Sequence, residues 1–135
     1  MAFELEITPR FRDIDSLGHV NNAVYLTYME EARTKYYMQT ARTKRLDEIE
    51  FILASAKVDF RSPIAWGETV VIRVWPTRIG MSSFTLGYEM RVKGDGRLAA
   101  EAESVQVAFD YAAKKSKPIP ATFRRALEAE LPATR

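Results

Sequence analysis

The sequence contains no cysteine and only one histidine among its 135 residues. Without cysteine there is no disulfide, no thiolate metal centre and no cysteine nucleophile. No serine lies in a Gly-x-Ser-x-Gly elbow, which excludes the serine hydrolases that carry that motif. Any chemistry on this chain must therefore come from other side chains.

Long apolar runs and a strong charge imbalance are also missing. No stretch approaches the ~20 consecutive apolar residues of a membrane span, and the charged, alternating start MAFELEITPRFRD does not resemble a signal peptide. These features predict a cytoplasmic protein without a membrane span. The 20 basic residues are balanced by 18 acidic ones, so nucleic acid is not an expected partner, although a net charge of +2 suits an anionic ligand.

The composition that remains is that of a folded protein. Hydrophobic residues make up 47% and charged residues 28% of the chain, which predicts one soluble domain over residues 1–135 with one core. Residues 3–9 alternate apolar with polar, as a strand does. From Asn22 to Thr40 the apolar period changes to that of a helix, and either Asn21 or Asn22 suits its N-cap. Its apolar stripe contains Tyr25, Tyr28, Met29, Ala32 and Tyr36.

The second half alternates in a way that favours strands at about 57–61, 69–75, 83–93 and 97–110. Lys93-Gly94-Asp95-Gly96 predicts a tight hairpin turn. The apolar parity of the last strand changes partway, which predicts a β-bulge near Glu103. A short helix follows Pro120, with Phe123, Leu127 and Leu131 spaced by four. The fold class expected is α+β, with an antiparallel sheet of about five strands packed on the long helix.

The stretch RFRDIDSLGHVNNAVY, residues 10–25, gathers polar side chains just before the long helix. One interpretation is structural, because carboxylates and asparagines there cap free helix amides and complement the helix dipole. A metal site is a second interpretation, but the calcium-loop spacing fails, since Leu17 and Val24 stand where oxygen ligands are required. Catalysis is the third, because free amides at a helix start can hold an oxyanion while a carboxylate acts as base or nucleophile.

A family resemblance favours the third interpretation. The pattern Asp13-x-Asp15-x-x-Gly18-His19-Val20-Asn21-Asn22-x-x-Tyr25 resembles the signature of hotdog-fold acyl-CoA thioesterases of the 4-hydroxybenzoyl-CoA thioesterase type, in the branch that carries His-Val-Asn-Asn. Residues 58–90 and 100–110 are similar to strands of that family, so the resemblance extends to about residue 126. It implies a long central helix wrapped by a curved antiparallel sheet, through which two chains dimerise.

The resemblance also implies roles for individual residues. Asp15 matches the catalytic carboxylate, as nucleophile or general base, and the backbone amide of Asn22 matches the donor that polarises the thioester carbonyl. His19 matches a histidine of the same branch, and Gly18 matches the tight turn before the helix. In the plant acyl-carrier thioesterases an asparagine lies two residues after the aspartate, where this chain has Leu17. An Asp-Asn-His scheme is therefore not expected, and His19 becomes an orienting partner.

Three further residues are candidates for substrate binding. Tyr25 matches a recurrent helix tyrosine, which suits either the site or the core. Arg78 is one of several basic side chains that suit the phosphates of coenzyme A. Ser83 is a candidate to line the site from a neighbouring subunit. We expect acyl-CoA as the substrate partner, no cofactor, no metal, and a homodimer or homotetramer, because a sheet with a single helix buries little surface by itself.

The function predicted from the sequence is therefore an acyl-CoA thioesterase, which hydrolyses a thioester to a carboxylic acid and free coenzyme A. The alternative is a non-hydrolytic hotdog module that binds acyl-CoA or acyl-carrier protein. A nucleic-acid-binding α+β domain is a weaker alternative, because it requires a basic face with exposed aromatic residues.

Overall fold

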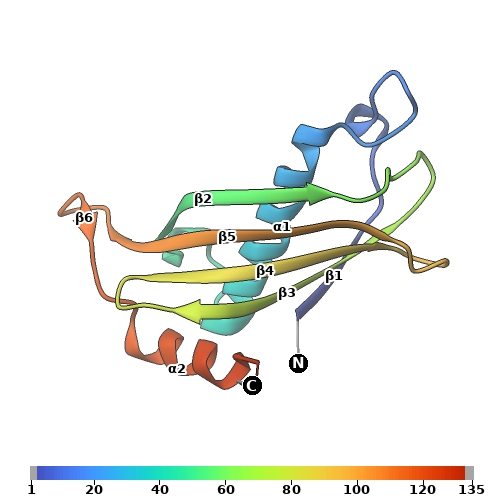
Figure 1. Cartoon of the computed structure of the whole chain (residues 1–135). Coiled ribbons are helices and arrows are strands. Elements are labelled where there is room, and N and C mark those ends of the chain that lie inside the picture. The colour runs from blue at the N-terminus through green and yellow to red at the C-terminus, as the bar shows by residue number, and fades with distance from the viewer. Residues whose placement is uncertain (1–2, 133–135) are drawn as a thin grey trace.

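The computed structural model describes residues 3–132. Its long elements follow the predicted order of one strand, one helix, four strands and a short helix (Figure 1). Two single-turn 3-10 helices, Phe11–Asp13 and Leu46–Glu48, lie in the connections before and after the long helix. The helices and strands are β1 (Phe3–Ile7), α1 (Asn22–Ala41), β2 (Phe51–Phe60), β3 (Val70–Ile79), β4 (Ser83–Val92), β5 (Leu98–Asp110), β6 (Lys115–Ser116) and α2 (Ala121–Glu130).

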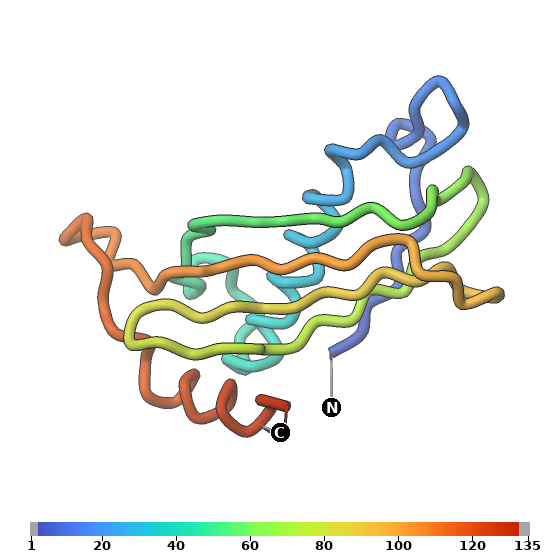
Figure 2. The backbone as a smooth tube through the Cα atoms, in the orientation of Figure 1, coloured from blue at the N-terminus to red at the C-terminus, as the bar shows by residue number. Residues whose placement is uncertain are grey.

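All strand pairings are antiparallel, in the order β1-β3-β4-β5-β2, and the short β6 pairs with β5. The sheet lies across α1, and α2 lies beyond β3, near one end of the sheet (Figures 1 and 2). The α+β prediction of a long helix, an antiparallel sheet of about five strands and a short C-terminal helix is confirmed.

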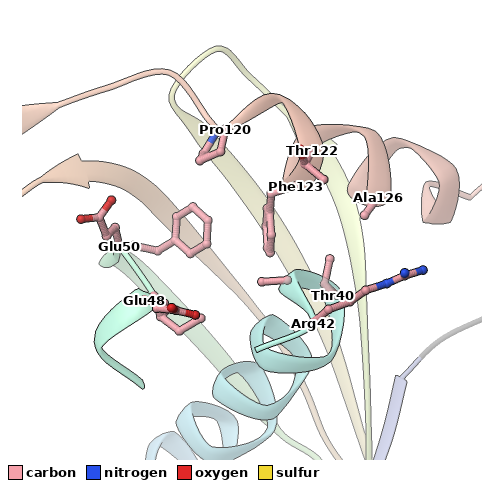
Figure 3. A pocket seen from close by; sticks show the side chains of 11 residues that line it. Thr40, Arg42, Glu48, Glu50, Pro120, Thr122, Phe123 and Ala126 are labelled. Atoms are coloured by element: carbon pink, nitrogen blue, oxygen red, sulfur yellow. The ribbon is translucent and has the colours of Figure 1, made fainter. Parts of the chain in front are cut away.

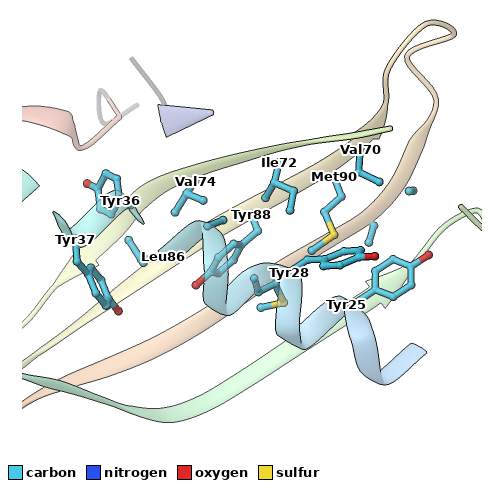
Figure 4. Packing of buried hydrophobic residues seen from close by; sticks show 14 of the residues in the cluster. Tyr25, Tyr28, Tyr36, Tyr37, Val70, Ile72, Val74, Leu86, Tyr88 and Met90 are labelled. Atoms are coloured by element: carbon cyan, nitrogen blue, oxygen red, sulfur yellow. The ribbon is translucent and has the colours of Figure 1, made fainter. Parts of the chain in front are cut away.

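The core forms between α1 and the inner face of the sheet (Figure 4). Alternation along β3 and β4 directs one set of side chains inward, and the predicted stripe of α1 meets them. Every residue of that stripe is buried, and so are the inward residues of the two strands: Val70, Ile72, Val74, Phe84, Leu86, Tyr88, Met90 and Val92. The inner face was therefore predicted correctly for these elements.

Strand β2 begins at Phe51, six residues before the predicted start at residue 57. It is an edge strand, and most of its side chains are exposed, including Ile52 and Leu53. Neither face of the first half of β2 is fully covered. Residues 51–56, FILASA, therefore show no alternation of apolar and polar residues that would predict a strand. Between Ala41, the last residue of α1, and Phe51 the chain forms a connection that contains the second 3-10 helix.

The predicted bulge near Glu103 is wrong. The register of β5 with β4 runs without a break from Val107 to Ala100, and the irregularity lies at Ala99. The inner face at this part of β5 carries two buried polar residues, Ser104 and Gln106, while Val105 and Val107 lie on the outer face and are partly buried. Because polar residues lie on the inner face here and apolar residues on the outer face, the apolar positions in the sequence shift by one residue. The strand itself continues regularly.

The C-terminal helix is partly as predicted. Phe123 and Leu127 of α2 are buried in the core, whereas Leu131 lies one residue beyond the helix and is more than one-third exposed. The hairpin turn at residues 93–96 is confirmed, with Gly94 and Gly96 at positive φ.

Candidate active site

Asp15 lies at the start of a tight turn that its own carboxylate stabilises. Its Oδ1 accepts hydrogen bonds from the backbone amides of Leu17, at 2.9 Å, and His19, at 3.3 Å. The backbone amide of Asp15 donates to the carbonyl of His19, at 2.8 Å, and the amide of Gly18 donates to the carbonyl of Asp15. The side chain is partly exposed, so one carboxylate oxygen fixes the turn while the other remains open to a ligand.

The turn leads directly into the N-terminus of α1. Asn21 is the N-cap, as predicted, and its side chain accepts a hydrogen bond from the amide of Ala23 at 2.9 Å. The carbonyl of Gly18, which lies four residues before Asn22 and so has the position of its helical acceptor, accepts a hydrogen bond from the amide of Trp66 instead. Asn22 is exposed, and within residues 3–132 its amide donates to no protein acceptor. A free amide at the positive end of the helix dipole is suited to a developing oxyanion.

Asp13 anchors this loop to the body of the protein. Its carboxylate is buried and accepts hydrogen bonds from the Tyr28 hydroxyl, at 2.8 Å, and the Arg10 amide, at 3.0 Å. Burial alone would raise the pKa of Asp13, but these two bonds and the charges of Arg10 and Arg12 hold it below its usual value. Its carbonyl also accepts from the Asn21 amide, at 2.9 Å. Asp13 therefore ties the loop to the N-terminal half of α1.

A segment that the sequence did not indicate supports the other side of the turn. Val20 donates its amide to the carbonyl of Ile64 at 2.8 Å, and His19 forms an isolated bridge with Ala65. Ile64 is fully buried, so the segment is held by the core. Only the turn signal at Trp66-Gly67 marks it in the sequence, and nothing local connects that signal with residues 15–20.

Gly18 adopts a φ of +80°, in the region that disfavours residues with a Cβ atom. Nothing lies within 4 Å of a Cβ built there, so the only penalty for alanine is conformational. We expect Gly18→Ala to lower the free energy of unfolding by about 1–2 kcal/mol. Urea denaturation measures the change, with the exposed neighbour Ser16→Ala as the control. Equal stabilities of the two variants would contradict the strained turn.

The structure separates the predicted substrate-binding residues. Tyr25 is a core residue, 2% exposed, and its ring packs edge-on against Phe60 with 4.9 Å between centroids. Arg78 and Ser83 lie at the β3–β4 turn, at the end of the sheet near α2 and away from the Asp15 turn (Figure 1). Asp15, Gly18 and His19 share one hydrogen-bonded turn, and Asn22 follows this turn as the first residue of α1.

A recess of about 580 Å³ lies at the other end of α1 (Figure 3). Phe51 and Phe123 form its apolar floor, with 4.8 Å between ring centroids, and Arg42, Glu48 and Glu50 lie at its rim. It is formed by the C-terminal end of α1, the start of β2 and the start of α2. It is therefore not the space next to Asp15.

Two features are absent from the described part of the chain. No group of three His, Asp or Glu side chains that could hold a metal ion occurs within residues 3–132. In the same range, no helix has both the length and the apolar character needed to cross a membrane. The site offers a carboxylate in the turn before α1 and a free amide at the start of that helix, groups that can drive and stabilise attack on an activated carbonyl.

Comparison with known proteins gives the class of this molecule. The profile of the Thioesterase-like superfamily matches residues 9–127. The chain is 24% identical to the long-chain acyl-CoA thioesterase FadM of Escherichia coli, over 93% of this chain and 96% of that protein. It is 27% identical to the 1,4-dihydroxy-2-naphthoyl-CoA hydrolase of Nostoc punctiforme, over 89% and 82%. A match to the uncharacterized protein YsmA of Bacillus subtilis, 29% identical, spans 64% of this chain and 59% of that protein.

Solved structures agree. A Thermus thermophilus thioesterase complexed with coenzyme A and Zn is 35% identical and superimposes with a TM-score of 0.83, over 93% of this chain and 91% of that chain. A predicted thioesterase from Bacillus stearothermophilus gives a TM-score of 0.90 at 24% identity over the whole of both chains, which shows the same fold. The chain belongs to the Thioesterase-like superfamily and has its hotdog fold. The predicted enzyme class, a thioester hydrolase, is thereby confirmed.

Proposed function

We propose that this protein is an acyl-CoA thioesterase that converts an acyl-CoA and water to a carboxylic acid and free coenzyme A. The observation that carries the proposal is the Asp15 turn, which holds a partly open carboxylate and leads into α1, where the amide of Asn22 has no acceptor within residues 3–132. A thioester is already activated, so one carboxylate and one oxyanion donor suffice for its hydrolysis.

In the proposed reaction, the Asp15 carboxylate either attacks the thioester carbonyl or removes a proton from the attacking water. The Asn22 amide stabilises the negative charge that develops on the carbonyl oxygen. His19 orients the turn through its backbone, and Gly18 gives the turn its shape. Mass spectrometry of acid-quenched enzyme distinguishes the two routes, because only the nucleophilic route leaves an acyl group on Asp15.

The choice of coenzyme A is supported by the Thermus thermophilus thioesterase, whose structure contains it. The His-Val-Asn-Asn stretch favours the branch of the family that also includes long-chain acyl-CoA thioesterases. Arg78 and Ser83 lie far from Asp15 in one chain, so we assign them to substrate contacts only across a subunit boundary. The proposed location is the cytoplasm.

The experiment that tests the proposal follows thiol release with a thiol-reactive dye from aromatic, short, medium and long acyl-CoAs. Turnover of one class supports the proposal and identifies the acyl group. Binding without turnover, measured by calorimetry with the same compounds, would favour the alternative, a non-hydrolytic module. Release only from acyl-carrier-protein thioesters would contradict coenzyme A as the carrier.

We also propose that the chain forms a homodimer through β2. This strand is an edge of the sheet, ten residues long, and carries the exposed apolar side chains Ile52 and Leu53. Such an edge pairs readily with a second copy about a two-fold axis. Ala54 and Ser55 lie near its middle and are exposed.

The double variant Ala54→Lys, Ser55→Lys is expected to shift the protein from dimer to monomer, because the two-fold axis brings like charges together. Light scattering coupled to size exclusion measures the mass. The double variant Ala121→Lys, Ala129→Lys, at two exposed positions of α2, is the control because it adds the same two positive charges away from β2. A wild-type monomer at micromolar concentration would contradict the dimer, and a wild-type tetramer would require a second interface.

A further inference from the structure

A group of polar side chains is buried between α1 and the sheet, apart from the Asp15 turn. We call it the Arg33 cluster, and its members are Arg33, Tyr37, Tyr88, Ser104 and Gln106. Arg33 is only 8% exposed, yet none of the ion pairs within residues 3–132 involves it. The guanidinium nitrogens of Arg33 are not among the fully buried side-chain atoms that have no hydrogen-bond partner, so they keep some accessible surface. A charge in such a mostly buried place is normally paired.

The direction of each hydrogen bond in the cluster follows from its neighbours. The Gln106 Nε2 donates to the carbonyl of Phe84 at 3.1 Å, so its Oε1 must act as the acceptor for Ser104. Ser104 thereby donates its only hydroxyl proton to Gln106. The Tyr88 hydroxyl must therefore donate to the Ser104 Oγ, at 2.6 Å. The Tyr88 oxygen then accepts from Arg33 Nη1 at 3.5 Å.

The chain of hydrogen bonds therefore ends at Arg33, whose guanidinium still has N–H donors without an acceptor. A guanidinium has five N–H groups, and only one of them has a partner here, in a long bond. Tyr37 lies one helical turn further along α1, on the same face, and its hydroxyl is buried with no hydrogen-bond partner within residues 3–132. Burial raises the pKa of Tyr37 well above its usual value, so this hydroxyl is also a donor. The cluster offers a positive charge and several donors, and apart from the long bond to Tyr88 none of the Arg33 and Tyr37 donors has an acceptor within residues 3–132.

The cluster can be reached from the side of β2. Ala56 is paired with Ser104 and Leu53 with Gln106, and directly paired residues point to the same face of a sheet. Ser104 and Gln106 are buried, yet Ala56 is exposed and Leu53 is 47% exposed. The inner face of β2 therefore has an uncovered strip at Leu53 and Ala56, between Phe51 and Val58, which pack against the core. Pairing of β2 with a second copy extends the sheet in its own plane and leaves this strip on the same face.

Beyond Ala56, the same face of β2 leads past the partly buried Val58 toward the Asp15 end of the molecule. Phe60, exposed at the end of β2, packs against Tyr25 in the first turn of α1. From Phe60 to Ala56 is about 13 Å along the strand. From Asn22 to Arg33 is about 16 Å along the helix. An acyl chain that starts at the Asn22 amide and follows β2 thus reaches Arg33 within its length.

We propose that the Arg33 cluster binds a carboxylate at the far end of the acyl group, so that the preferred substrates are mono-CoA thioesters of dicarboxylic acids. A carboxylate supplies the missing negative charge and two acceptor oxygens, which match the guanidinium fork and the Tyr37 hydroxyl. The inference rests on the proposed thioesterase function, because it assigns the distal end of that substrate.

The test compares kcat/KM for dicarboxylic mono-CoA thioesters of increasing length with that for methyl-ended thioesters of the same length. Wild type is expected to prefer the carboxylate-ended substrate about 10- to 100-fold at the length that spans the strip, the scale of a charged hydrogen bond. Arg33→Met keeps the apolar stem and is expected to abolish the preference. Tyr37→Phe removes one oxygen and is expected to reduce it, which keeps the test valid if Arg33→Met does not fold.

Lys35→Met is the matched control, because Lys35 is an exposed cation on the same helix whose partner is Glu31. It should leave the preference unchanged. The carboxylate site is contradicted if wild type shows no preference, if the preference survives in Arg33→Met, or if a hydroxyl-ended substrate is preferred instead.

Failure of the thioesterase function itself is distinguishable, because then no thioester is hydrolysed. In that case a non-hydrolysable dicarboxylic thioether of coenzyme A should still bind wild type more tightly than Arg33→Met, and equal binding would overturn the site.

Discussion

Replacing Asp15 by asparagine is expected to lower kcat by about 100-fold or more, the scale of losing a general base or a nucleophile. The substitution keeps the shape of the side chain and an oxygen that can accept from the amides of Leu17 and His19. It removes only the negative charge that drives the attack. The turn should therefore survive, and KM should change little if the carboxylate acts mainly in the transition state.

The measurement is thiol release on the best acyl-CoA, with melting temperature recorded for each variant. Asp110→Asn is a matched control, because the Asp110 carboxylate also holds a turn, by accepting from the Ala113 amide at 3.0 Å, and lies at the other end of the sheet. Near-normal turnover in Asp15→Asn, with Asp110→Asn also normal, would reject Asp15 as the catalytic carboxylate.

Replacing Asp13 by alanine should have the largest effect on stability. It leaves the buried Tyr28 hydroxyl and the Arg10 amide without their acceptor, which costs about 2–4 kcal/mol of unfolding free energy. The double variant Asp13→Ala, Tyr28→Phe should recover part of this loss, because the hydroxyl is then absent rather than unsatisfied. Full additivity of the two single changes in urea denaturation would show that the bond contributes nothing.

Asp13 also predicts an acid dependence of stability. The pKa of Asp13 in the folded protein lies below the usual value of 3.8. At a pH between the folded pKa and the unfolded pKa, Asp13 is protonated in the unfolded chain but ionised in the folded chain. The stabilisation is present at neutral pH and is lost as pH falls below about 4 and through the folded pKa. Wild type should therefore lose stability more steeply than Asp13→Asn in that range. Parallel curves for the two proteins would contradict a lowered pKa.

Local sequence patterns were sufficient to predict some of the helices, strands and turns. The period of α1 and the alternation of β3 and β4 were readable because each element has one face on the core and one toward solvent. The turn before α1 was readable because Gly18 and Asn21 act on their immediate neighbours. Edge strand β2 and polar-faced β5 were misjudged, because their faces do not follow the rule of apolar inside and polar outside.

The Arg33 cluster illustrates what a local pattern leaves out. Met29, Arg33 and Tyr37 are spaced by four on α1, so a charged residue interrupts an apolar stripe. That signal indicates a buried arginine but not its surroundings. Tyr88 and Ser104 come from two other elements, and only their positions show that the hydrogen bonds end at Arg33 with no acceptor left.

The sequence by itself determined the long helix and the loop that carries Asp15, since period, capping and turn chemistry act over a few residues. The class of the protein came from the resemblance of residues 13–25 to a known family. The tertiary structure decided which residues meet. It brought Ile64 and Ala65 against the turn, placed Tyr25 in the core, and moved Arg78 and Ser83 to the far end of the sheet. The physical reason is that strand order and register join residues distant in the chain, and no local preference encodes those pairings.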